Sequence, residues 1–200
     1  MGSEGATTAE HPLRLLERWL AEARSAGAPE PGAVAFVTVS AEGRPSARTV
    51  QLKRVEDEAL VFSSALWTRK AREIEANPRV ALLFHWPTVG RQVHVSGRAV
   101  LAERALAEEL FDERELGHRV QTLVSRQGET IDSIEALRAR HAHLMKTLEA
   151  PPPCPPDWGA IRVRADAIEF WREAPDRMHD RLLHERVDEG EGWSVTRLSP

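Results

Sequence analysis

The chain has 200 residues, of which 42% are hydrophobic and 29% are charged, a composition typical of one folded, soluble domain. The formal net charge of −4 argues against a general nucleic-acid-binding protein. The single cysteine, Cys154, excludes an intrachain disulfide framework. Because no charged-then-apolar leader is present and no apolar run approaches about 18 residues, we expect a cytoplasmic protein with no membrane contact.

The N-terminal part predicts a short tail, a helix and a hairpin. Residues 1–10 are small and polar, so we expect them to be disordered. Leucines at helical spacing predict an amphipathic helix from Pro12 to Ala26. The apolar run 33–39 predicts a strand, which the turn at Glu42–Gly43 would connect to a second strand.

The stretch from Arg48 to Lys70 carries the most information. Residues 48–53 form a β-favouring run, residues 60–62 predict a second strand, and small residues at 63–65 predict a break. A helical pattern then continues to Ala76.

The start of this helix is unusual in its charge. Thr68 is a candidate N-cap, which places Arg69 and Lys70 in the first turn, at the positive end of the helix dipole. An anion bound to the free backbone N–H groups would remove the conflict. The alternative is a basic turn exposed to solvent, because a cation in this position costs only ~0.3–1 kcal/mol.

The middle of the chain predicts two strands and two helices. The nearly continuous apolar run 80–86 predicts a strand buried on both faces, and residues 91–101 alternate as a strand with one buried face. Gly97 predicts a bulge or sharp bend within the second strand. Helical spacing of apolar residues predicts helices at 103–114 and 130–148.

The last third predicts a β-meander after a stiff connector. The proline-rich segment 150–156 can be neither helix nor central strand. The later apolar runs predict antiparallel strands at 160–164, 168–171, 181–186 and 193–197. This order of elements predicts a mainly β protein, a closed β-barrel with peripheral helices, in a single domain covering residues 11–200.

Three basic residues are spaced by two near the C-terminus. In an extended segment, Arg177, His179 and Arg181 would leave the same face, and an anion would relieve their repulsion. The alternative is that nearby acids neutralise them as ordinary surface pairs, namely Asp176, Asp180 and Glu185. His141 and His143 lie two apart on a predicted helix and so face apart, and we expect no metal site.

Several separated motifs together resemble the pyridoxamine 5′-phosphate oxidase family, flavoenzymes built on an FMN-binding split β-barrel. The similarity runs from about Leu15 to Pro200. The motifs that carry it are Arg48–Lys53, Arg69–Lys70, Asn77–Pro78, Arg91–Val93, Ser125–Gln127, Ile168–Trp171 and Arg177–Arg181. The resemblance implies a homodimer with FMN between the subunits, and a C-terminal segment at about 158–200 that serves dimerisation and substrate binding.

The resemblance also implies roles for individual residues. The positions that would bind FMN are Arg48, Thr49, Val50, Gln51, Leu52, Lys53, Ser63, Ser64, Arg69, Lys70, Gln92, Gln127, Trp171 and Arg181. A small anionic substrate would be bound by Lys53, Arg114, His118, Arg177 and His179. Of these, Arg177 and His179 would be catalytic, orienting the reacting carbon and stabilising developing charge.

Three positions depart from the family pattern. Leu110 stands where the family usually has a tyrosine, His118 where it has a serine, and Ser63 where an aromatic residue contacts the flavin. Each lost hydroxyl donor would cost ~0.5–1.5 kcal/mol or more at a charged group. A protonated His118 would restore part of this loss.

The resemblance implies an FMN-dependent oxidoreductase that uses O2 to oxidise pyridoxine or pyridoxamine 5′-phosphate to pyridoxal 5′-phosphate. One alternative is a flavin oxidase of phenazine biosynthesis, which acts on a reduced, carboxylated ring. Retention of Lys53 favours the first activity, and loss of the tyrosine and serine favours the second. The third hypothesis is a non-catalytic flavin- or haem-binding barrel.

Overall fold

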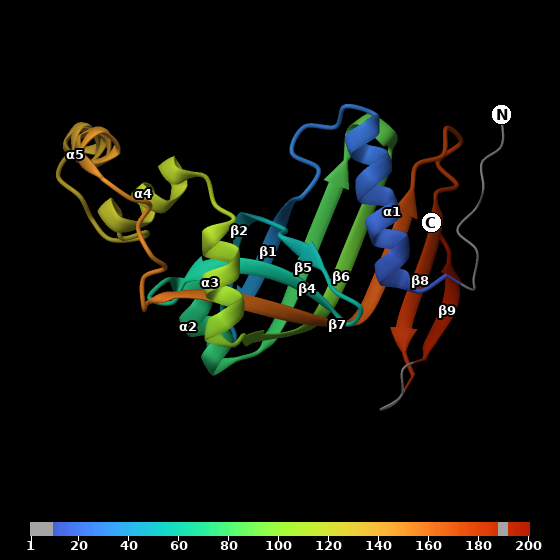
Figure 1. The fold of residues 1–200 in the computed structure, drawn as a ribbon. Coiled ribbons are helices and arrows are strands. Elements are labelled where there is room, and N and C mark those ends of the chain that lie inside the picture. Colours follow the sequence, from blue (N-terminus) through green and yellow to red (C-terminus); the bar gives the residue numbers. More distant parts are fainter. Residues whose placement is uncertain (1–9, 188–191) are drawn as a thin grey trace.

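The computed structural model describes residues 10–187 and 192–200, so the predicted disorder of the N-terminal tail concerns residues that, except for Glu10, lie outside the described part. Its elements are drawn in Figure 1. In chain order they are α1 (Pro12–Ser25), β1 (Ala33–Val39), β2 (Pro45–Gln51), β3 (Arg54–Val55), β4 (Ala59–Ala65), α2 (Arg69–Ala76), β5 (Arg79–Trp86), the short 3-10 helix η1 (Pro87–Val89), β6 (Arg91–Leu101), α3 (Arg104–Asp112), α4 (Leu116–Val124), α5 (Ile134–Thr147), β7 (Trp158–Arg172), β8 (Asp180–Arg186) and β9 (Trp193–Leu198).

The strands form one antiparallel sheet that curls on itself. Its order is β2-β1-β5-β6-β7-β4-β3, with β8 and β9 added beside the far half of β7. The two ends of this order, β2 and β3, belong to one stretch of chain, residues 45–55. Its first part pairs with β1 and its last part pairs with β4, so this stretch connects the two edges of the curled sheet. The predicted mainly β barrel with peripheral helices is confirmed.

The hydrophobic core fills the inside of the curl, and α1 covers it. Alternate residues of the strands point inward, with Phe36, Phe62 and Phe84 among the fully buried side chains. From α1, Leu16 and Trp19 belong to the same buried cluster. Figure 1 shows α1 lying along the sheet between β6 and β8. The predicted amphipathic helix is therefore confirmed, since its apolar stripe packs on the sheet.

The longest strand, β7, corrects two predictions. Residues 160–164 and 168–171 belong to one continuous strand and not to two. The small residues at 63–65 were predicted to end the strand. They continue β4 instead, because they pair with residues 158–160 of β7. Small side chains suit this pairing, since a Cβ on Gly159 would lie 2.3 Å from the Leu66 side chain.

The apolar strand β5 is buried on one face only. Val80, Leu82, Phe84 and Trp86 are buried, whereas Leu83 is 37% exposed. The prediction of a strand buried on both faces is therefore wrong in the single chain. The intervening side chains point to the outside of the curl, where helix α1 does not reach them.

Helices α4 and α5 extend away from the barrel, as Figure 1 shows at the left. Helix α4 was not predicted, although Leu116, Val120 and Val124 recur at helical spacing in residues 116–124. Helix α5 begins at Ile134, later than predicted, because Ser133 caps it through the backbone N–H of Ala136. None of its residues is buried. Within residues 10–187 and 192–200, no helix has the length and apolar character needed to span a membrane.

Gly97 provides a test of how tightly the barrel closes. The β6–β7 register shifts between Ser96 and Gly97, which confirms the predicted bulge, and a Cβ on Gly97 would lie 2.2 Å from the carbonyl oxygen of Arg164. We expect Gly97→Ala to lower the free energy of unfolding by about 1–3 kcal/mol, as overpacked sites do. Urea denaturation measures this change.

The control is Gly117→Ala in α4, where an added Cβ meets nothing within 4 Å. Alanine favours a helix interior by up to about 1 kcal/mol over glycine, so this variant is expected to be neutral or more stable. Equal effects of the two substitutions would contradict the close approach at Gly97.

Candidate functional site

Residues from β2, β4, α2 and the α3–α4 connection surround a cavity of about 180 Å³, here called the cation pocket. It is lined by Thr49, Val50, Gln51, Lys53, Ser63, Ser64, Lys70, Arg114, Gln127 and Trp158. Three of these residues are basic and none is acidic. All of them except Trp158 were predicted as site residues, so the structure brings together residues that lie up to 78 positions apart in the sequence.

A second hollow of about 260 Å³ adjoins the cation pocket and shares Lys70 and Gln127 with it. We call it the α2 hollow, because it lies at the N-terminus of that helix. Its other lining residues are Ser46, Ala47, Arg48, Thr68, Arg69 and Gly128. Lys70 therefore lies between the two hollows. Lys53 and Arg114 line the cation pocket on one side, and Arg48 and Arg69 line the α2 hollow on the other.

Lys70 is a buried cation whose partners are uncharged. Helix α2 begins at Arg69 with Thr68 as its N-cap residue, as predicted. The Lys70 side chain folds back, so that Nζ donates to Ser64 Oγ at 2.9 Å and to Thr68 Oγ1 at 3.3 Å. Only 6% of the residue is exposed. Burial, with a further contribution from Arg48, lowers the pKa of Lys70 to about 8.

Arg114 and Lys53 form the other cationic wall. The Arg114 guanidinium lies over the Trp158 ring at 4.5 Å, and Nη2 donates to the carbonyl oxygen of His118 at 3.1 Å. Burial lowers the pKa of Arg114. The pKa of Lys53 is lowered by burial and then by the charge of Arg114. The two cations are close enough to repel each other, and a bound anion would relieve this repulsion.

The acids nearest this wall are held by another residue. Arg54 forms ion pairs with Glu109, at 2.8 Å, and with Glu113. Because one guanidinium gathers both carboxylates on the outer side of α3, the cation pocket keeps its positive charge.

Glu73, a buried acid behind the α2 hollow, was not predicted from the sequence. Burial alone would raise the pKa of this carboxyl group, but hydrogen bonds from Ser46, Thr38 and Arg69 outweigh burial and lower the pKa to about 2. The four-residue spacing of Arg69 and Glu73 on a helix could have indicated their ion pair, which measures 2.7 Å. Trp158, which was not predicted as a site residue, is both buried and part of the cation pocket wall.

A second group of predicted residues lies around β8, and we call it the β7–β8 cluster. It comprises Gln92, Trp171, Arg177, His179 and Arg181. Trp171 is the strand neighbour of both Gln92 and Arg181, and its ring centre lies 4.6 Å from that of His179.

The segment before β8 is a turn and not an extended strand. Arg177 has φ of +66°, and the backbone N–H of Ala174 donates to Nδ1 of His179 at 3.1 Å. The predicted common face of Arg177, His179 and Arg181 is therefore wrong. The Ala174 contact requires Nδ1 to accept, so Nε2 carries the proton of the neutral His179 ring.

Two of the acids named in the alternative interpretation, Asp176 and Asp180, have other partners. Arg181 Nε donates to Glu169 at 2.7 Å, whereas Asp180 pairs with Arg197. Asp176 accepts the backbone N–H of Met178 at 3.0 Å, which stabilises the turn. In the alternative interpretation, nearby acids neutralise these basic residues; for Arg181 an acid does so, but it is Glu169 and not Asp176, Asp180 or Glu185.

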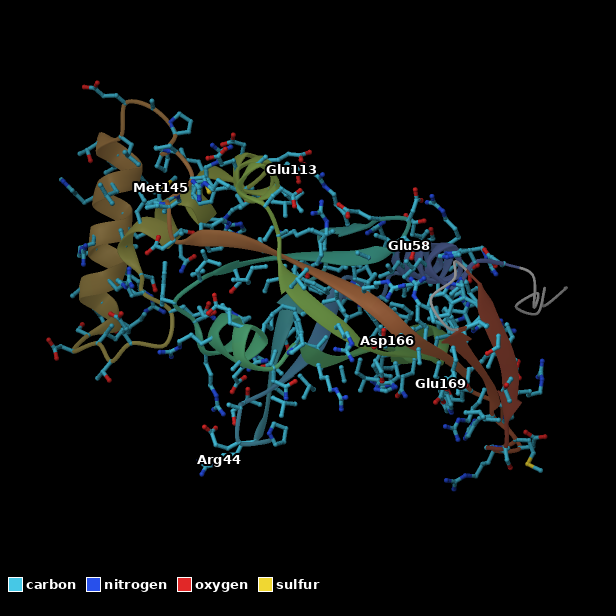
Figure 2. All side chains as sticks on the ribbon, turned by 90° about the horizontal axis from the view of Figure 1, so that it is seen from below. Arg44, Glu58, Glu113, Met145, Asp166 and Glu169 are labelled. Carbon is cyan, nitrogen blue, oxygen red and sulfur yellow. The ribbon has the colours of Figure 1, made fainter. Side chains whose placement is uncertain are left out.

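Within one chain the β7–β8 cluster lies far from the cation pocket. Ser63 pairs with Ala160 on β7, and Gln92 pairs with Trp171 on the same strand. These two β7 positions are separated by eleven residues, which corresponds to about 35 Å along a strand. In Figure 2, Glu113, adjacent to Arg114 in the sequence, and Glu169, the partner of Arg181, lie in different regions of the molecule. One flavin ring cannot contact both groups in a single chain.

Three further residues that the sequence singled out do not line the cation pocket. The Leu52 side chain packs against the core and does not line the cation pocket. His118 lies exposed on α4. Leu110, in the place of the family tyrosine, is 1% exposed and packs with Val61 and Ala160 beneath α3.

Comparison with protein families identifies the chain. Residues 20–147 match the pyridoxamine 5′-phosphate oxidase family model. The chain belongs to this family. Residues 158–200 match the family's pyridoxine 5′-phosphate oxidase C-terminal dimerisation region, which supports a homodimer. The family is one of oxidases, so the chain is an oxidoreductase.

Individual relatives cover nearly the whole chain. It is 46% identical to the pyridoxine/pyridoxamine 5′-phosphate oxidase of Rubrobacter xylanophilus over 190 residues, which are 94% of this chain and 87% of that protein. It is 41% identical to the enzyme of that name from Burkholderia vietnamiensis, over 98% of this chain and 92% of the relative.

Among solved structures, the fold is similar to that of PhzG from Burkholderia lata in complex with tetrahydrophenazine-1-carboxylic acid. The TM-score is 0.89 at 33% identity, over 95% of this chain and 93% of PhzG. A pyridoxamine 5′-phosphate oxidase-related, FMN-binding protein from Nostoc punctiforme has a TM-score of 0.79 at 18% identity, over 96% of this chain and all of the other, and shares the fold.

The buried charge of Lys70 gives a prediction for the cofactor-free protein. Its folded-state pKa of about 8 lies below the ordinary value of 10.5, so the charged amine destabilises the fold below pH 8, and this effect fades as the pH rises from 8 to 10.5. We expect Lys70→Met to raise the free energy of unfolding at pH 7 by about 3 kcal/mol. The gain should shrink towards pH 10.5.

Urea denaturation at several pH values measures this difference. The control is Lys146→Met, because Lys146 is an exposed lysine on α5 and its replacement should leave stability and its pH dependence nearly unchanged. A Lys70→Met variant whose stability follows the wild type at every pH would show that this lysine is not desolvated.

Proposed function

We propose that this protein is an FMN-dependent oxidase that converts pyridoxine or pyridoxamine 5′-phosphate to pyridoxal 5′-phosphate with O2. The observation that carries the proposal is the cation pocket, which places Lys53, Lys70 and Arg114 around one cavity without an acidic residue in its lining. The similarity to pyridoxine/pyridoxamine 5′-phosphate oxidases, at up to 46% identity, supports a phosphorylated substrate.

The residues of the α2 hollow fit the phosphate group of FMN. Phosphate needs positive charge and free backbone N–H groups, and the α2 N-terminus provides both beside Arg48, Arg69 and Lys70. Lys70 is the strongest sign of this fit, because a buried ammonium with hydroxyl partners is stabilised by an anion. Next to it, the 49–51 stretch, Ser63, Ser64 and Gln127 would line the flavin.

The site is completed by a second copy of the chain. Apart from Gln92, which pairs with Trp171, the β7–β8 cluster lies in the region that matches the family's dimerisation segment, far from the cation pocket of its own chain. In the homodimer, Gln92, Trp171 and Arg181 of one protomer would contact FMN held by its partner. Arg177 and His179 would reach the substrate in the same way.

The substrate anion would be bound by Lys53 and Arg114. Arg114 is already oriented by the Trp158 ring and the His118 carbonyl oxygen, so little side-chain freedom is lost on binding. His118, exposed near the start of α4, would add a donor. A C-terminal pair of donors, Arg177 and His179, would orient the reacting carbon.

Bound FMN would supply the redox chemistry, as acceptor of a hydride from the carbon next to the amine or alcohol and as the source of electrons for O2. The protein supplies orientation and charge. With Nδ1 accepting from the Ala174 N–H, the Nε2–H of His179 would donate a hydrogen bond that orients the substrate oxygen or nitrogen, and the proton that this atom loses on oxidation would pass to solvent. The Arg177 guanidinium, on the same turn, would stabilise negative charge that develops beside it.

A second candidate is oxidation of a reduced, carboxylated ring, as in phenazine biosynthesis. Two observations favour it. The fold matches PhzG, solved with tetrahydrophenazine-1-carboxylic acid, with a TM-score of 0.89. Leu110 is buried in the core and offers no hydroxyl to a phosphate. Lysine and arginine bind a carboxylate as well as a phosphate, so the cation pocket serves either substrate.

Anaerobic flavin reduction tests the proposal. The protein is reconstituted with FMN and mixed with pyridoxine 5′-phosphate, and flavin absorbance is followed without oxygen. We expect rapid bleaching with formation of pyridoxal 5′-phosphate, because the substrate donates its hydride to the flavin.

The control substrate is unphosphorylated pyridoxine, which lacks the anion and should bleach the flavin far more slowly at equal concentration. A yellow protein that is bleached by a reduced phenazine carboxylate but not by pyridoxine 5′-phosphate would establish the second candidate. Failure to bind FMN at all would overturn both.

A further inference from the structure

Glu73 is a buried carboxylate directly behind a hollow that is otherwise lined by cations. Its side chain is 7% exposed and contacts Thr38 of β1 and Ser46 of β2. By charge alone, an acid in this position weakens the binding of any anion in the α2 hollow. Its presence there needs a physical reason.

The contacts of Glu73 give that reason. Oε2 accepts hydrogen bonds from Ser46 Oγ, at 2.5 Å, and from Thr38 Oγ1. Oε1 accepts from Arg69 Nε at 2.7 Å. Donors from β1, β2 and α2 therefore meet on one carboxylate, which offsets the cost of burying it.

The same network fixes Arg48. Its Nη2 lies 3.5 Å from Glu73 Oε2 and donates to Ser46 Oγ at 2.6 Å. Its Nη1 donates to Thr38 Oγ1 at 2.7 Å and to the carbonyl oxygen of Phe36 at 2.9 Å. Arg48 is thus held by groups that themselves hydrogen-bond to Glu73.

Arg69 depends on Glu73 in a different way. Its side chain is 63% exposed and would otherwise sample many rotamers. The bond to Glu73 uses only Nε, so the two terminal nitrogens stay available to a ligand in the α2 hollow. An oriented guanidinium loses less entropy when it binds a phosphate.

We propose that Glu73 is a positioning residue for phosphate recognition, which orients Arg48 and Arg69 toward the phosphate group of the bound flavin nucleotide. The inference rests on the proposed function, because it takes FMN as the ligand of the α2 hollow. It goes further in assigning a binding role to an acidic residue that cannot itself contact the phosphate favourably.

The test compares FMN with riboflavin, which has the same ring system and no phosphate. Dissociation constants for both are measured by quenching of flavin fluorescence, in wild type and in the near-isosteric variant Glu73→Gln. We expect Glu73→Gln to weaken FMN binding about tenfold or more and to change riboflavin binding less than about twofold, because only the phosphate contacts lose their orientation.

The control variant is Glu75→Gln, which removes the same charge from an exposed position of α2. It should leave both dissociation constants nearly unchanged.

Three results would overturn the inference. Tighter FMN binding by Glu73→Gln would show that the acid acts only through its charge. Equal weakening of FMN and riboflavin binding would show a general structural role, and unchanged binding of both would show no role. In each of these cases the proposed function stands as long as the wild-type protein prefers FMN to riboflavin. A wild type without that preference would instead count against the proposed cofactor.

Discussion

The closing of the curled sheet by residues 45–55 is the constraint on which the rest of the structure depends. One stretch pairs with β1 through its first half and with β4 through its second half, so its path is fixed at both ends. Between these pairings the chain leaves regular strand geometry at Leu52 and Lys53. Leu52 turns into the core, while Lys53 faces the cation pocket. The barrel cannot close without placing the 48–53 motif along the wall of the site.

The charge distribution follows from this geometry. Cations from β2, α2 and the α3–α4 connection gather around two adjoining hollows, and nearby acids are held elsewhere. Arg54 binds Glu109 and Glu113 on the outside of α3, and Glu73 lies behind the cations rather than among them. The positive charge is therefore concentrated on the side that faces a ligand. An anion bound there would be attracted by the cations and would relieve the repulsion between them.

Sequence patterns predicted the parts of this structure that local rules determine. The strand at 33–39 and the bulge at Gly97 have local causes in alternation and backbone freedom, and α2 starts after Thr68 as predicted, although the Thr68 side chain makes no capping hydrogen bond. The site residues of the cation pocket followed from a family resemblance, since no local rule connects Ser63 with Arg114. Long-range features were missed, such as the burial of Glu73 and the one-sided exposure of β5, because they depend on which elements pack together.

The central claim is that each site takes its cation pocket from one protomer and its β7–β8 cluster from the other. Lys70→Met and Arg181→Gln disable one part each, and the two variants are unfolded, mixed in equal amounts and refolded. If the site is shared, mixed dimers hold one intact site, so the account predicts recovery of about one quarter of wild-type FMN binding, where each variant alone binds little. No recovery in mixed dimers confirmed by mass would contradict a site built from two chains.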